Sequence, residues 1–173
     1  MANIELLAPI VLQWEGKTYT DSPSDRGGPT KMGITLSAWK SQGYDKDGDG
    51  DIDEDDVKLL TMADFTFILK SRWDRWQADK IVNQSIANLL VDWVYCSGKW
   101  GIILPQRLLF VKDDGLVGRY TISAVNKSNQ AFLHKMILDA RRDFLYNIVC
   151  NDKSQNKWLN GWMNRLKSFP FIK

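Results

Sequence analysis

Apolar residues recur at helical spacing along most of the chain. In the first segment they fall three or four positions apart, which is the period of one helix face: Leu7, Ile10, Val11 and Trp14. Pro9 predicts that this helix starts near that residue or bends there. The same spacing returns over residues 82–94, and a short apolar helix is predicted over residues 103–110. The pattern predicts a mainly α-helical protein.

The longest predicted helix covers residues 130–149, and a final helix carries two tryptophans. One apolar stripe is expected along the long helix, formed by Phe132, Met136, Ala140, Phe144 and Ile148. Capping residues mark two earlier helix starts. Thr35 or Ser37 can cap a short helix, and Thr61 followed by Asp64 resembles a capping box that opens a helix through Trp73 and Trp76.

Residues 16–34 interrupt the helical pattern. They are rich in Gly, Pro, Ser, Asp and Thr, which predicts a loop with a short β-hairpin. A weak boundary between two lobes is predicted near residues 78–85. We expect two lobes, residues 1–80 and 81–173, packed as one unit.

Composition is that of a soluble globular protein, with 44% hydrophobic and 25% charged residues. The net charge of +2 hides an asymmetry, because residues 45–56 hold eight acids and one lysine. The rest of the chain has 22 basic and 13 acidic residues, which favours an anionic partner such as nucleic acid, a membrane surface or bacterial cell wall. No nucleic-acid-binding module is recognisable, and no apolar run approaches the length of a membrane span.

Two further features bear on the compartment. Cys96 and Cys150 could form one disulfide, but two buried free thiols are expected, because the cysteine density is far below that of a disulfide scaffold. The first residues carry neither a basic leader nor a small-residue cleavage site. The sequence therefore predicts a protein made in the cytoplasm without a signal peptide.

The acidic run has the spacing of an EF-hand calcium loop. Counted from Asp45, glycine stands at position 6, where the loop turns sharply, and Ile52 at position 8 is expected to anchor the loop. Position 12 is an aspartate in place of the usual glutamate, which makes magnesium a competitor. We expect one cation with a structural role, held by Asp45, Asp47, Asp49, Asp51, Asp53 and Asp56.

The candidate catalytic residue is Glu15, at the end of the first predicted helix beside Trp14 and Gly16. A carboxyl group placed there can be partly desolvated, which raises its pKa and suits a general acid. A polar loop with Asp21, Asp25 and Thr30 follows. Such a set is what glycoside hydrolysis requires, because one acid protonates the leaving oxygen and a second polar group handles water or the developing cation.

The stretch "EGKTYTDSPSDRGGPTKMGIT" (15–35) closely resembles the signature of glycoside hydrolase family 108, the N-acetylmuramidases of phage and secretion-activator type. The second half resembles the peptidoglycan-binding region that follows the catalytic part in that family. Its residues are "VDWVYCSG" (91–98), "DGLVGRYTISAV" (114–125), "ARRDFLY" (140–146) and "GWMNR" (161–165).

The resemblance implies a lysozyme-like helical fold with a small hairpin and an EF-hand-like calcium loop. It also implies lysozyme-type cleavage between N-acetylmuramic acid and N-acetylglucosamine, with Glu15 as general acid. Asp25, or else Asp21, would assist water and Thr30 would position it. Tyr19, Asp21 and Trp14 would bind the sugar. We expect a monomer that acts on peptidoglycan in the periplasm or cell wall after holin-type or other non-classical release.

Two alternatives remain open. The motif holds one extra residue, at Lys17-Thr18, and this insertion could leave a catalytically silent peptidoglycan-binding module. Alternatively, the acidic loop could belong to a calcium-dependent export accessory protein. Wall binding that survives loss of Glu15 would indicate the first, and calcium-dependent capture of a partner without glycan cleavage would indicate the second.

Overall fold

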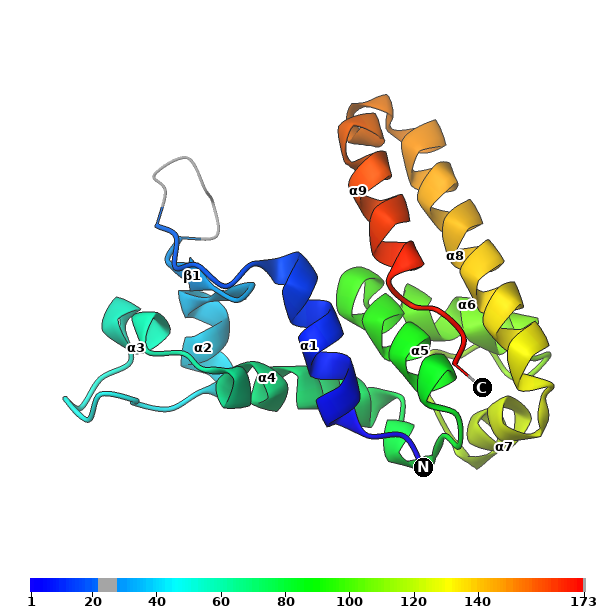
Figure 1. Ribbon diagram of the computed structural model, residues 1–173, viewed down its shortest axis with the longest axis horizontal. Helices are drawn as coiled ribbons and strands as arrows, with labels where there is room; N and C mark the ends of the chain where they lie inside the picture. Colours follow the sequence, from blue (N-terminus) through cyan, green and yellow to red (C-terminus); the bar gives the residue numbers. More distant parts are fainter. Residues whose placement is uncertain (22–27, 173) are drawn as a thin grey trace. The chain divides into compact units, whose positions relative to one another are not determined.

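The computed structural model describes residues 1–21 and 28–172. Over these residues the protein is mainly helical, as predicted, and two short strands pair in an antiparallel sheet (Figure 1). It divides into two compact units. One is Ile4–Ser71, and the other combines Met1–Asn3 with the chain from Arg72 onward. The division falls inside helix α4 (Met62–Arg75).

The first unit begins with α1 (Ile4–Glu15), which buries Leu7, Ala8, Val11 and Leu12. The helix continues through Pro9, so the predicted start near Pro9 is wrong. Strands β1 (Thr30–Lys31) and β2 (Ile34–Thr35) form the predicted hairpin, with Thr30 opposite Thr35 and Lys31 opposite Ile34.

The other helices of this unit start at side-chain caps. Of the two residues predicted to cap α2 (Leu36–Gln42), Thr35 does so, because its hydroxyl accepts the Ala38 N–H at 3.2 Å. The short helix α3 (Glu54–Lys58) follows the acidic loop. At the start of α4, the Asp64 carboxylate accepts the Thr61 N–H at 2.7 Å, which confirms the predicted cap.

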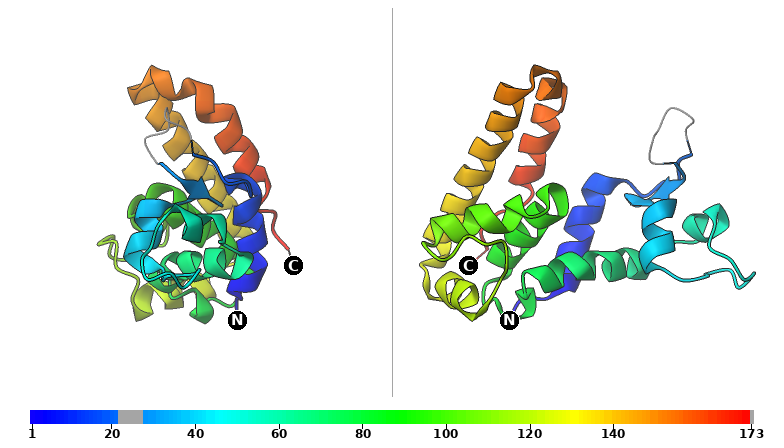
Figure 2. Two further views of the ribbon diagram at one scale, coloured as in Figure 1. Left: turned by 90° about the vertical axis from the view of Figure 1, so that its left-hand side faces the viewer. Right: turned by 180° about the vertical axis from the view of Figure 1, so that it is seen from behind.

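The second unit is entirely helical among the residues that the structure describes. α5 buries every residue from Ser85 to Val94 and packs against α6 and α8. α8 and α9 lie side by side as a helical hairpin (Figures 1 and 2). The elements are η1 (Ala78–Lys80), α5 (Gln84–Ser97), α6 (Trp100–Leu108), α7 (Arg119–Lys127), α8 (Gln130–Asn151), η2 (Lys153–Gln155) and α9 (Asn156–Lys167).

The predicted apolar stripe of α8 is displaced by one residue. Phe132 is exposed, and the buried positions are Leu133, His134, Ile137, Arg141, Leu145 and Val149. The physical reason is an ion pair. The Arg141 guanidinium donates to the fully buried Asp92 carboxylate of α5 at 2.7 Å, and Arg165 of α9 donates to the same carboxylate at 2.7 Å. A charged residue therefore occupies the centre of the buried face.

The cysteines and the tryptophans differ in their burial. Cys96 and Cys150 are exposed thiols, so their predicted burial is wrong. Of the tryptophans, Trp39, Trp73, Trp76 and Trp93 are fully buried, whereas Trp100 and Trp158 are exposed.

Among the described residues, the helices lack the combination of length and apolar character that crossing a bilayer requires.

Candidate active site

Glu15 is the last residue of α1 and is half-buried, as is Trp14 beside it. Gly16 follows with φ of +77°, in the left-handed region that commonly ends a helix. The chain then leaves the helix axis, and Asp21 is exposed. Asp25 lies outside the described residues.

The turn of the β-hairpin lies directly against Glu15. Met32 and Gly33 are the two turn residues, with φ of +55° and +71°, as in the type I′ turns that suit two-residue hairpins. A Cβ atom added at Gly33 would lie 2.7 Å from Glu15 Oε2 and 3.1 Å from Glu15 Cβ. The absence of a side chain at Gly33 therefore allows the Glu15 carboxyl group to rest on the turn.

A third segment extends the hairpin. Thr20 and Thr30 exchange backbone hydrogen bonds of 2.8 and 2.9 Å, so the chain just after Glu15 returns to the edge of β1. The Thr30 hydroxyl donates to the Gly28 carbonyl oxygen at 2.8 Å. Thr30 thus joins both segments, and its hydroxyl stabilises the approach to β1.

Helix α3 contacts both the segment after Glu15, through Tyr19, and the hairpin, through Lys31. The Tyr19 hydroxyl donates to Glu54 Oε2 at 3.2 Å, and the Lys58 ammonium lies 5.5 Å from the centre of the Tyr19 ring. Burial, followed by the Glu54 carboxylate, raises the pKa of Tyr19. The Lys31 ammonium of β1 donates to the Lys58 carbonyl oxygen at the end of α3. One short helix therefore anchors both Tyr19 and the hairpin.

The acidic loop leads into α3 and gathers its carboxylates in two groups. Oxygens of Asp45, Asp47 and Asp49 lie within 4.8 Å of one another, and so do those of Asp51, Asp53 and Asp56. The Asp45 carboxylate also accepts the Gly48 and Gly50 N–H groups at 2.6 and 2.9 Å. Repulsion from Asp49 is the largest of the effects that raise the pKa of Asp51.

Asp56, the last acidic position, is fully buried. Its two oxygens accept the backbone N–H groups of Lys46 and Asp53, at opposite ends of the loop. Burial raises the pKa of this carboxyl group, but the backbone hydrogen bonds outweigh it and the pKa is lowered. Lys46 also pairs with Asp64 of α4 at 2.9 Å. The loop is thereby tied to both α3 and α4.

The donor chemistry of the loop fits a hard divalent cation, which prefers several carboxylate and carbonyl oxygens. Gly48 and Gly50 have φ of +83° and +105°, which permits the tight turns that bring alternate carboxylates together. The two groups together comprise the six aspartates predicted to bind the ion.

Sequence reasoning missed two residues of the site, Glu54 and Lys58. Gly33 belongs to the motif, but its contact with Glu15 is visible only in the structure. Glu54 accepts a hydrogen bond from Tyr19, which lies 35 residues earlier in the sequence. The Lys58 carbonyl oxygen accepts one from Lys31, which lies 27 residues earlier. One signal was present for Glu54, because position 10 of the acidic run is not a ligand position and is therefore available for another partner.

Comparison with known families identifies the class of protein. The family model for Glycosyl hydrolase 108 matches residues 8–98, and the model for a Predicted Peptidoglycan domain matches residues 100–167. The chain belongs to the glycosyl hydrolase 108 family, which confirms the family resemblance. It is a peptidoglycan-acting enzyme or binder.

A solved structure resembles nearly the whole chain. It is the structure of Brucella abortus SagA, which is 28% identical in sequence, with a TM-score of 0.71. The match covers 95% of this chain and 89% of that one. The helical fold with its small sheet fits the predicted lysozyme-like fold. A comparison with curated proteins found no match.

Proposed function

We propose that this protein is an N-acetylmuramidase that hydrolyses the bond between N-acetylmuramic acid and N-acetylglucosamine, with Glu15 as the general acid. One observation carries the proposal. In a chain of this glycoside hydrolase family, the Glu15 carboxyl group ends a helix and is held against the hairpin turn at Gly33. A fixed, half-buried carboxyl group is the element that protonation of a glycosidic oxygen requires.

The reaction follows from that requirement. Glu15 transfers its proton to the glycosidic oxygen while the bond to the anomeric carbon of N-acetylmuramic acid breaks. A water oxygen then bonds to the anomeric carbon, and a proton of that water passes to a carboxylate. Asp25, or else Asp21, would be that carboxylate, and Thr30 would position the water. Trp14 and Tyr19 would contact the sugar rings.

Purified sacculi test the proposal. The protein is expected to release soluble muropeptides and to create one reducing end for each bond that it cleaves. Sedimentation of the protein with sacculi without any release would instead favour a non-catalytic binding module. That alternative has one observation in its favour, the match of residues 100–167 to a peptidoglycan domain.

We also propose that the acidic loop binds one calcium ion with a structural role, and that magnesium competes for it. The site would act through α3, because this helix begins at Glu54, directly after Asp53, and anchors Tyr19 and β1. A bound cation would neutralise the repulsion among the aspartates and fix α3 against the hairpin.

Calcium is therefore expected to raise thermal stability. At a free concentration of 100 times the dissociation constant, one site contributes about 2.7 kcal/mol to the free energy of unfolding. Chelator should reverse the gain and slow muropeptide release. In the double variant Asp47→Asn/Asp49→Asn the side-chain oxygens that accept backbone N–H groups are kept, but two charges are lost, so calcium affinity should fall. Asp113→Asn, which changes an exposed aspartate paired with Arg107, is the matched control.

Gly33→Ala tests the contact that places Glu15. The new Cβ would meet the Glu15 carboxyl group, so muropeptide release is expected to fall roughly a hundredfold, as for a misplaced catalytic group. Gly28→Ala is the control, because Gly28 also has a positive φ of +66° but has open space around the added atom. Each variant loses about 1 kcal/mol of stability from the left-handed backbone. Equal activity of the two variants would contradict the proposed role of Gly33.

A further inference from the structure

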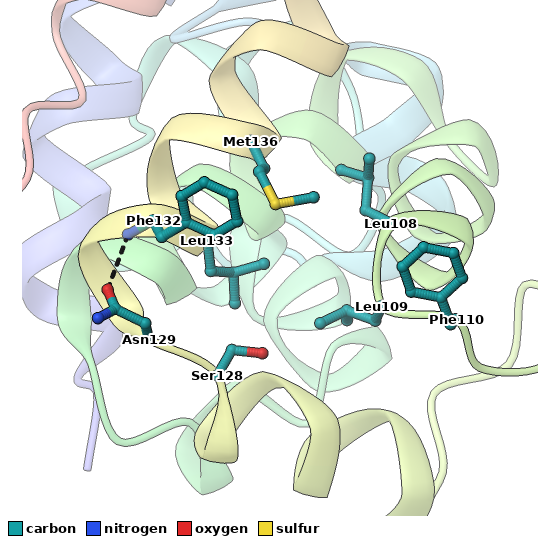
Figure 3. A pocket seen from close by; sticks show the side chains of 8 residues that line it. All are labelled: Leu108, Leu109, Phe110, Ser128, Asn129, Phe132, Leu133 and Met136. Atoms are coloured by element: carbon teal, nitrogen blue, oxygen red, sulfur yellow. Dashed lines mark hydrogen bonds between the residues drawn. The ribbon is translucent and has the colours of Figure 1, made fainter.

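A hollow of about 280 Å³ opens on the second unit, between the end of α6 and the start of α8. Figure 3 shows Phe110 and Phe132 on opposite sides of it, with Met136 and Leu133 between them and the Ser128 hydroxyl at the rim. Its lining is mostly apolar. The other residues that line it are Leu108, Leu109 and Asn129.

Phe110 is in a position that the fold does not explain. It follows the C-cap of α6, where the Phe110 N–H donates to the Arg107 carbonyl and the Val111 N–H donates to the Gln106 carbonyl, both at 3.1 Å. This is a Schellman motif, whose left-handed residue is usually glycine. Phe110 adopts φ of +53° there, so its backbone is strained.

Burial of the Phe110 side chain does not offset this backbone strain. It is 94% exposed, so the ring contributes almost nothing to the hydrophobic stabilisation of the fold. Phe132, in the first turn of α8, is 63% exposed. Strained backbone is typical of functional sites, and two exposed rings flanking one apolar hollow are typical of a binding surface.

The charge and the family of this segment indicate the partner. Residues 100–167 contain 11 Lys and Arg but 5 Asp and Glu, so the segment is basic, which favours an anionic partner such as the cell wall. The same residues match the peptidoglycan domain model. A second hollow of the same unit, of about 130 Å³, is lined by Val111 and by the exposed Leu116 and Tyr120.

We propose that this hollow is a glycan-binding site separate from the Glu15 site, in which Phe110 and Phe132 hold one N-acetylated sugar of a peptidoglycan strand. The apolar C–H face of a pyranose ring stacks on an aromatic ring, and the acetyl methyl group packs on Leu133 and Met136. The Ser128 hydroxyl is placed to accept a hydrogen bond from a sugar hydroxyl. The proposal rests on peptidoglycan being the substrate, and it gives the second unit the role of holding the strand.

The test is co-sedimentation with purified, protein-free sacculi, with every variant in a Glu15→Gln background so that the wall stays intact. Phe110→Gly supplies the residue that the Schellman motif favours, so its midpoint of thermal unfolding should rise while its affinity for sacculi falls roughly tenfold. Phe132→Ala should also bind more weakly. Trp158→Ala removes another exposed aromatic residue of the same unit and should bind normally.

Peptide-free glycan strands are the second probe, and they should bind the Glu15→Gln protein more tightly than its Phe110→Gly variant. Unchanged binding of both phenylalanine variants would overturn the proposal. So would weaker binding that is accompanied by lower stability of Phe110→Gly, because the ring would then be structural. A change in self-association alone would assign the hollow to a second copy of the chain. Because binding is measured without cleavage, these results are independent of whether Glu15 is catalytic.

Discussion

Glu15→Gln is expected to reduce muropeptide release by roughly a thousandfold, the scale of losing a general acid. Glutamine has nearly the same shape but cannot transfer a proton to the glycosidic oxygen. The contact with Gly33 involves the Cβ, Cγ and Oε2 atoms of Glu15, and glutamine provides equivalents of all three. Folding should therefore be unaffected, and the variant should still sediment with sacculi.

The thermal midpoint and the circular dichroism spectrum are the controls for this variant. A soluble, folded Glu15→Gln protein that still releases muropeptides at the wild-type rate would exclude Glu15 as the general acid. Folded variants of Asp21, Asp25 and Thr30 should then be measured in the same assay, because these residues form the rest of the predicted catalytic set.

Asp92→Asn is expected to cause the largest loss of stability, about 3–5 kcal/mol, the range for breaking a buried ion pair. The Asp92 carboxylate is fully buried and accepts hydrogen bonds from Arg141 of α8 and Arg165 of α9. Within the described residues, Nε and Nη1 of Arg141 have no hydrogen-bond partner. Asp92 therefore supplies the negative charge that compensates the buried Arg141.

Asp139→Asn is the matched control. Asp139 also pairs with two cations, Lys135 and Arg142, at 2.6 and 2.8 Å, but its side chain is 39% exposed. Solvent screens such a pair, so its loss should cost below about 1 kcal/mol. Chemical denaturation of both variants measures the difference. Equal stability losses would contradict the proposed importance of burial at Asp92.

Local signals predicted much of the fold. The caps at Thr35 and at Thr61 with Asp64 depend on residues three apart, and both are present in the structure. The length of α8 was also predicted closely, because its apolar period runs over many turns. The buried face of α8 was not predicted, since Arg141 looks like a surface residue until Asp92 is known to face it.

The candidate site divides in the same way. Glu15 at a helix end and the alternating aspartates of the acidic loop are local patterns, and the sequence contained both. The contacts that join them are not local. The hydrogen bond from Tyr19 to Glu54 depends on where α3 packs. The contact between Glu15 and Gly33 depends on how the hairpin folds back onto α1. Spacing along the chain determines neither.

The most direct test of the central claim is the identity of the new reducing ends. Wild-type protein should digest purified sacculi, after which the products are reduced with borohydride and analysed by mass spectrometry. The muramidase proposal predicts that every new end is reduced N-acetylmuramic acid, and that Glu15→Gln yields almost none. New ends made of N-acetylglucosamine, or the absence of any new end with protein that still binds the wall, would contradict it.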